Sequence, residues 1–97
     1  MTAAGGTGPV DQPPTVCSVS GNKSAVITFN NNSSSVSITP VWIDYSCVEQ
    51  PYSSIAPGGS QAFSSYVTHP WRIRNSATNA LLVEIPPLTG DTTVNFP

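Results

Sequence analysis

The stretch from Ser65 to Trp71 places a serine hydroxyl, the only imidazole of the chain and an indole within seven residues. Two further aromatic residues, Trp42 and Tyr52, lie upstream in the fragments Pro-Val-Trp and Gln-Pro-Tyr. A serine hydroxyl and the neutral imidazole of His69 supply both a hydrogen-bond donor and an acceptor. Flat indole and phenol faces bury compact apolar groups. These residues therefore predict one small pocket in which aromatic rings surround a pair of groups that bind a hydroxyl.

Ser65 and His69 also suggest a hydrolase, because an acid such as Asp44 would complete a Ser-His-Asp set. The chain lacks the Gly-x-Ser-x-Gly elbow of many such enzymes, and nothing in the sequence places an acid behind the single histidine. The fragment Gly58-Gly59-Ser60 indicates a turn and not a phosphate-binding loop, because no lysine and no helical pattern follow it. We therefore expect no enzymatic activity and no catalytic residues.

The length of 97 residues is sufficient for one domain with a single small core. The segment from Met1 to Pro14 is rich in Gly, Ala, Thr and Pro and has no apolar periodicity. We therefore expect residues 1–16 to form a flexible leader and residues 17–97 to form the domain. The leader lacks the basic start and apolar middle of a signal peptide.

The charge pattern argues against nucleic acid and membranes as partners. The sequence has three Lys and Arg residues and five Asp and Glu residues, which gives a net charge of -2 with histidine neutral. Phosphate backbones require clustered positive charge, which Arg72 and Arg74 alone do not provide. No run reaches the 18 or more apolar residues of a membrane helix. We expect a monomer that binds neither nucleic acid nor membranes.

The two cysteines, Cys17 and Cys47, have no Cys-x-x-Cys spacing and only one histidine beside them in the chain. This pattern excludes a zinc site, and we expect no metal or other cofactor. A disulfide and two inert thiols both remain open; a disulfide would close a loop of about 30 residues and contribute roughly 3 to 4 kcal/mol. The low charge and the glycosylation sequons at Asn22, Asn31 and Asn32 lean toward an extracellular setting, with an intracellular one left open.

Strand patterns occur along the whole chain and no stretch sustains a helical period, which predicts an all-β fold. We expect a long irregular connection over residues 46–59, and a short hairpin formed by residues 61–67 and 71–74. The apolar side chains change parity at Pro40, which predicts a bulge or an edge position there. The expected strands cover residues 26–29, 36–45, 61–67, 71–74, 80–85 and 92–96.

The segment from Val26 to Phe96 resembles the β domain of the von Hippel-Lindau tumour suppressor, the substrate-recognition domain of a ubiquitin ligase. The resemblance implies a small seven-stranded antiparallel β-sandwich. The residues before Val26 match poorly, and either Asn31 or Asn32 could occupy the family's buried asparagine position. The matching fragments follow in order as Pro40-Val41-Trp42, Pro51-Tyr52, Pro57-Gly58, Ser65-Tyr66, His69 with Trp71, and Leu81-Leu82-Val83.

The same resemblance implies a non-catalytic module that recognises 4-hydroxyproline in an extended peptide or protein segment. Ser65 and His69 would bind the hydroxyl of the modified proline. Ser64 and Tyr66 would make main-chain contacts with a peptide that runs beside their strand. The aromatic residues that would surround the proline ring are Trp42, Tyr52 and Trp71.

The family continues into a helical domain that binds an elongin adaptor, whereas this sequence stops at Pro97, where the sandwich ends. We therefore expect no elongin binding and no ubiquitin ligase recruitment by this chain alone. A second interpretation remains open, in which the sandwich binds carbohydrate or protein, or is a structural part of a larger chain, without hydroxyproline specificity. In that case Trp42 and Trp71 would be core residues, and His69 a turn residue held extended by Pro70.

Overall fold

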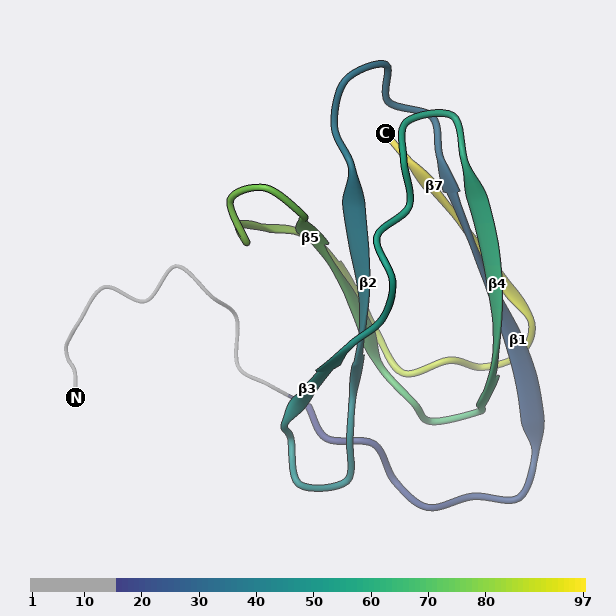
Figure 1. The fold of residues 1–97 in the computed structure, drawn as a ribbon. Coiled ribbons are helices and arrows are strands. Elements are labelled where there is room, and N and C mark those ends of the chain that lie inside the picture. Colours follow the sequence, from purple (N-terminus) through teal and green to yellow (C-terminus); the bar gives the residue numbers. More distant parts are fainter. Residues whose placement is uncertain (1–15) are drawn as a thin grey trace, which may run out of the picture.

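The computed structural model describes residues 16–97, which form seven strands in two sheets (Figure 1). The expected leader over residues 1–16 lies outside the described residues except for Val16. No helix within this described part of the chain is long and apolar enough to cross a membrane. The strands are β1 (Ser24–Asn31), β2 (Ile38–Ile43), β3 (Glu49–Pro51), β4 (Ser60–Tyr66), β5 (Trp71–Asn75), β6 (Leu81–Ile85) and β7 (Thr92–Phe96).

One sheet has the strand order β4-β1-β7 and the other has the order β3-β2-β5-β6. Figure 1 shows β4, β1 and β7 on one side of the molecule and β2, β3 and β5 on the other. The predicted all-β, seven-stranded sandwich is confirmed, with one difference in strand direction. β7 pairs with β1 in parallel, whereas all other pairs are antiparallel. The difference arises because the chain crosses from one sheet to the other between β6 and β7, so β7 does not form a hairpin with its neighbour.

The core lies between the two sheets and follows from the alternation of side chains along each strand. Ile27 and Phe29 of β1 are fully buried, as are Ile38 of β2 and Ile73 of β5. Branched and aromatic side chains of this kind pack well on a pleated surface. The buried cluster joins strands of both sheets, which fixes the distance between them.

The predicted hairpin of residues 61–67 and 71–74 is wrong. β4 pairs with β1, whereas β5 pairs with β2 and β6 in the opposite sheet. Residues 67–70 therefore cross from one sheet to the other. The alternating pattern showed that both strands bury one face, but it could not show that they bury these faces against each other.

Pro40 lies within β2 without the predicted bulge. The ladder between β2 and β5 continues through Pro40, and the irregularity in β5 lies between Ile73 and Arg74, on the side of β6. Pairing with β3 ends at Val41, and the carbonyl of Pro40 then accepts a hydrogen bond from the backbone of Tyr52 at 2.9 Å. The N–H and C=O of a strand residue point to the same edge, so the missing donor of proline faces the end of β3 and the ladder with β5 is intact.

Strand β3 was not expected, because residues 46–59 were predicted to be irregular. Its three residues are half-buried or exposed and show no apolar alternation. Only its hydrogen bonds to β2 identify it as a strand. Farther along the same connection, Ile55 bridges to Ile38 and is buried in the core.

Asn31 is the buried asparagine, since only 1% of its surface is exposed. Its amide nitrogen donates to the carbonyls of Val36 at 2.7 Å and Ile55 at 3.0 Å, and its oxygen accepts from the backbone of Ser33 at 3.0 Å. One side chain thus ties the end of β1 to two separate connections. Its burial also removes Asn31 as a glycosylation acceptor, whereas Asn32 is exposed.

We predict that Asn31→Ala lowers the free energy of unfolding by roughly 2 to 4 kcal/mol, because it leaves buried carbonyls without donors. Urea unfolding followed by tryptophan fluorescence measures this change. Asn32→Ala is the matched control and should change stability by no more than about 0.5 kcal/mol. Equal effects of the two variants would contradict the structural role assigned to Asn31.

Candidate functional site

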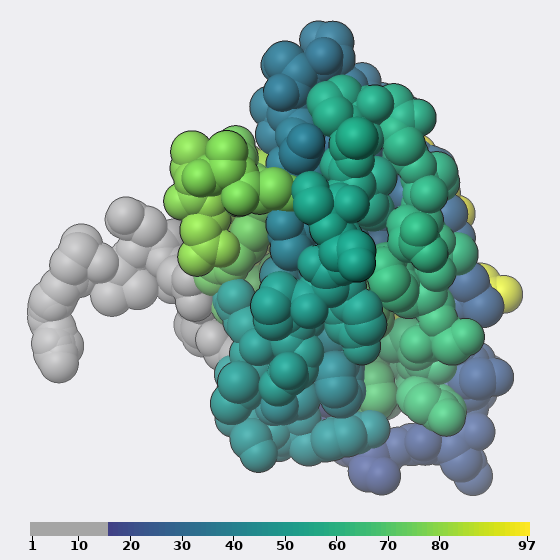
Figure 2. Space-filling view, viewed as in Figure 1, coloured from purple at the N-terminus to yellow at the C-terminus, as the bar shows by residue number. Residues whose placement is uncertain are grey.

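A pocket of about 140 Å³ opens between the aromatic residues of both sheets. A cavity of about 150 Å³ accommodates a benzene ring, so this volume suits one small ring and not a drug-sized ligand. Figure 2 shows the face on which the connection after β3 and strand β4 lie next to each other. The residues that line the pocket are Trp42, Tyr45, Tyr52, Ser64, Ser65, Tyr66, His69 and Trp71. All seven residues expected from the sequence are therefore brought together, and Tyr45 joins them.

The two tryptophans face each other across neighbouring strands. Trp42 of β2 and Trp71 of β5 are direct partners in the antiparallel ladder, so their side chains lie on the same face of the sheet. Trp71 is only 2% exposed and belongs to the core, while Trp42 is half-buried and packs against it. A place at the core and a place in the pocket therefore do not exclude each other, because Trp71 is a core residue and both rings line the pocket.

Ser65 reaches the pocket from the opposite sheet. The indole N–H of Trp71 donates to the Oγ of Ser65 at 3.1 Å, and Ser65 is 4% exposed. A serine hydroxyl has two acceptor lone pairs and one donor proton. Because the indole occupies one lone pair, Ser65 keeps its proton and one lone pair for a ligand. This bond also joins β4 to β5 across the two sheets.

Two aromatic groups form the walls of the pocket. On one side His69 stacks on Trp42 with ring centroids 5.4 Å apart and an interplanar angle of 28°. On the other side Tyr52 contacts Trp71 at 5.5 Å, and Phe63 stacks behind them on Trp71 at 5.6 Å. Aromatic pairs at such distances hold each other in defined orientations. The walls are therefore set before any ligand binds.

His69 lies in the connection that crosses from β4 to β5, and it is buried. Its backbone N–H donates to Tyr66 at 3.2 Å, and its carbonyl accepts from Leu88 at 3.2 Å. The preceding Thr68 has a φ of 78°, an uncommon conformation for a branched residue. Hydrogen bonds from Thr68 to the carbonyls of Leu88 and Val19, both at 2.8 Å, hold this conformation. The crossing connection is thus fixed on both sides of the histidine.

Burial lowers the pKa of His69 below its usual value of 6.5. Removal from water disfavours the charged imidazolium, so the ring is neutral at pH 7. A neutral imidazole has one N–H donor and one acceptor nitrogen. His69 can therefore accept a hydrogen bond from a hydroxyl group, which an imidazolium could not do.

Tyr52 follows β3 directly, and ion pairs on the outer face of the sheet hold this short strand. Glu49 of β3 accepts hydrogen bonds from Arg74 at 2.6 Å and from Arg72 at 2.6 Å. These bonds, with that from Arg74 the stronger, lower the pKa of Glu49 against the opposing effect of burial. Arg72 also contacts Glu84 of β6 at 3.0 Å, so it links three strands. Both arginines therefore stabilise strand β3, which positions Tyr52.

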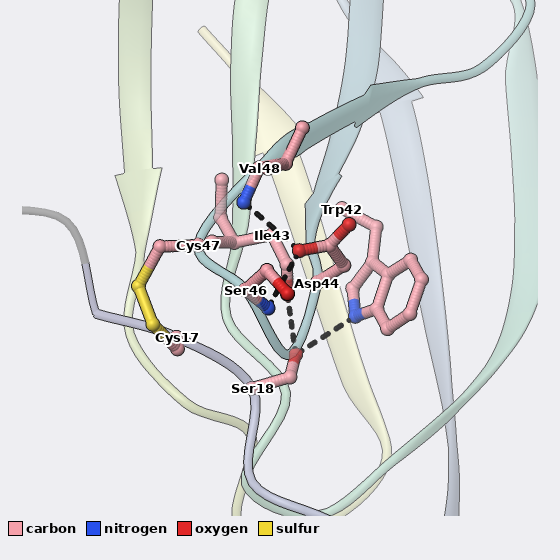
Figure 3. The surroundings of a disulfide bond; sticks show 8 residues. All are labelled: Cys17, Ser18, Trp42, Ile43, Asp44, Ser46, Cys47 and Val48. Atoms are coloured by element: carbon pink, nitrogen blue, oxygen red, sulfur yellow. Dashed lines mark hydrogen bonds between the residues drawn. A yellow bond between two sulfur atoms is a disulfide. The ribbon is translucent and has the colours of Figure 1, made fainter.

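The segment before β1 supports the pocket from outside. The indole N–H of Trp42 donates to the Oγ of Ser18 at 2.9 Å, and the same hydroxyl donates to the carbonyl of Ile43 (Figure 3). Next to Ser18, Cys17 forms a disulfide with Cys47 in the turn after β2. The disulfide thus holds the segment whose serine fixes one wall of the pocket.

Neither Ser18 nor Tyr45 was among the site residues predicted from the sequence. Each residue lies close in sequence to a cysteine, and the possible disulfide between Cys17 and Cys47 was the one pattern that could have brought both toward the pocket. Spacing alone could not show the contact, because it depends on a bridge between distant segments.

Comparison with known families places the chain beside a known domain. The model of the VHL beta domain matches residues 16–91, which is more than half of the chain. The resemblance that the sequence suggested is confirmed, and the match extends to the residues before Val26. This family consists of non-catalytic domains that recognise protein substrates.

We predict that replacing both Cys17 and Cys47 by serine lowers the free energy of unfolding by roughly 2 to 4 kcal/mol. The loss arises because the unfolded chain is no longer constrained and the Ser18 segment is no longer held. Urea unfolding measures it, with the wild type in reductant as the matched control. The reduced wild type should unfold like the variant, and equal stability of variant and oxidised wild type would contradict the prediction.

Proposed function

The chain belongs to the VHL β-domain family, and from this premise we propose that it is a non-catalytic module that binds 4-hydroxyproline in an extended peptide or protein segment. The observation that carries the proposal is the convergence of Ser65 and His69, from two different elements, on one ring-sized pocket between aromatic walls. A pyrrolidine ring is compact and apolar, so it suits such walls. Its hydroxyl requires polar partners once water is displaced.

The polar groups of the pocket complement a hydroxyl in both directions. The Oγ of Ser65 already accepts from Trp71, so its proton is available to the ligand oxygen. The neutral ring of His69 can accept the proton of the ligand hydroxyl. Unmodified proline would fill the same space but leave both groups unpaired, at roughly 1 to 3 kcal/mol for each. Selectivity for hydroxyproline over proline then comes from the hydrogen bonds that proline cannot make, and not from the shape of the ring.

The edge of the smaller sheet provides a place for the rest of the peptide. β4 is an outer strand, and no strand within residues 16–97 pairs with its other edge. An extended peptide can add to such an edge through main-chain hydrogen bonds. Ser64 and Tyr66 flank Ser65 on this strand and are exposed, so their backbone groups are suited to contact the peptide. The partner class is a peptide or protein that contains hydroxyproline.

We predict that the chain binds a peptide with 4-hydroxyproline at least about 100-fold more tightly than the same peptide with proline, because two polar groups lose their partners. Isothermal titration calorimetry with the paired peptides measures the ratio. Ser65→Ala should reduce this preference about tenfold or more.

Ser60→Ala is the matched control, because Ser60 lies at the other end of β4 and bonds to Asn30. It should preserve the preference for hydroxyproline. Equal binding of the two peptides by the wild type would reject the proposal. Binding of a glycan that survives Ser65→Ala and is lost with Trp71→Ala would instead support a carbohydrate-binding sandwich.

We also predict that affinity for the hydroxyproline peptide is constant above pH 7 and decreases as the pH falls through the lowered pKa of His69, below 6.5. Protonation removes the acceptor nitrogen, so only the neutral fraction binds and the affinity falls by up to about tenfold per pH unit. A peptide without groups that titrate in this range isolates the effect. Affinity that does not fall as His69 becomes protonated, with the ring titration followed by NMR on the same samples, would contradict the role of the neutral ring.

A further inference from the structure

Tyr45 makes a polar contact with the histidine of the pocket. Its hydroxyl lies 3.2 Å from the Nε2 of His69, and the two rings meet edge to face with centroids 5.3 Å apart and an interplanar angle of 82°. Tyr45 also meets Trp42 edge to face at 5.6 Å. The phenol therefore contacts both groups that form one wall of the pocket, and it lines the pocket itself.

The position of Tyr45 is set by its turn and not by burial, because 53% of the residue is exposed. In this turn one carboxylate oxygen of Asp44 accepts from the backbone of Ser46 at 2.8 Å and of Val48 at 2.9 Å. The other oxygen accepts from the side chain of Gln50 at 2.9 Å. These bonds, with that from Val48 the strongest, lower the pKa of Asp44.

The turn is anchored to the rest of the domain as well. Cys47 has a φ of 64° and forms the disulfide with Cys17. The backbone N–H of Ser18 donates to the carbonyl of Asp44 at 3.1 Å, so a second link holds the start of the turn. Figure 3 shows the turn held between the disulfide and Ser18. A rigid turn thus presents an exposed tyrosine to His69.

The phenol occupies Nε2 in either tautomer of the imidazole, but the two tautomers present different groups to the pocket. If the phenol donates to Nε2, the ring proton is on Nδ1, and the pair presents that N–H as a donor and the phenol oxygen as an acceptor. If Nε2–H donates to the phenol oxygen, the phenol proton becomes the donor and Nδ1 the acceptor. Nδ1 and the phenol oxygen lie on different sides of the ring, so one ligand hydroxyl contacts Nδ1 alone, and only the second tautomer leaves Nδ1 as the acceptor for that hydroxyl.

We infer that Tyr45 is a specificity-determining residue of the pocket, whose hydroxyl acts together with His69 to recognise the hydroxyl of the ligand. The inference rests on the proposed function. It assigns to Tyr45 a polar role beyond the packing of its ring. Replacement of Tyr45 by phenylalanine separates these roles, because the ring contacts to Trp42 and His69 are retained and only the hydroxyl is lost.

The test compares the wild type with Tyr45→Phe in titrations with the paired hydroxyproline and proline peptides at pH 7.5. We expect the affinity for the hydroxyproline peptide to fall about three- to tenfold while the affinity for the proline peptide stays the same. Ser76→Ala is the control, because Ser76 lies beyond the far end of β5 and its hydroxyl bonds to Thr39 and Ser54. It should leave the ratio of the two affinities unchanged.

A second measurement on the free protein reports the pairing directly. His69 is the only histidine, so the nitrogen chemical shifts of its ring are unambiguous and show which nitrogen carries the proton. We expect Tyr45→Phe to change the populations of the two tautomers. Unchanged nitrogen shifts would overturn the pairing of phenol and imidazole.

The outcomes separate the inference from the proposed function. A preference for hydroxyproline in the wild type that Tyr45→Phe leaves unchanged within twofold overturns the inference and leaves the proposed function standing. No preference in the wild type rejects the proposed function, and the inference falls with it. A reduced preference together with changed nitrogen shifts supports both.

Discussion

Packing of two indole rings, one buried and one half-buried, each with an N–H that needs an acceptor, is the constraint on which the rest of the structure depends. A buried polar group without a partner destabilises a fold by as much as a large apolar contact stabilises it. Trp71 meets this demand with Ser65 of the opposite sheet, and Trp42 meets it with Ser18 of the segment before β1. The two hydrogen bonds therefore connect the packing of the core to the polar groups at its surface.

This arrangement explains why the pocket can be small and still discriminate. The serine that satisfies Trp71 is held by the core, so its hydroxyl oxygen has a fixed position in the pocket. The histidine is held by a crossing connection with an unusual φ at Thr68, which hydrogen bonds stabilise. Preorganised polar groups lose little entropy when a ligand binds, so more of their interaction energy appears as affinity.

The sequence predicted most of the strands, because the alternation of apolar and polar residues along β1 and β7 follows the burial of their side chains. The residues of the pocket were predicted from their chemical types and from a family resemblance, since no periodicity connects Trp42, Tyr52 and Ser65. Strand pairing was harder to predict. The apolar pattern of β4 and β5 is the same whether they form a hairpin or belong to facing sheets, and β3 has no apolar pattern. The contacts of Ser18 and Tyr45 depend on a disulfide that sequence alone left open.

The disulfide and the pocket are parts of one arrangement. In a domain of this size the core is small. The disulfide links Cys17 to Cys47 in the turn after β2, and it limits motion there, where few apolar contacts restrain the chain. The turn carries Tyr45, and the linked segment carries Ser18, which holds Trp42. Both residues act on the wall that contains His69, while the core holds the wall that contains Trp71. The two walls therefore have different sources of rigidity, one in apolar packing and one in a covalent link with hydrogen bonds.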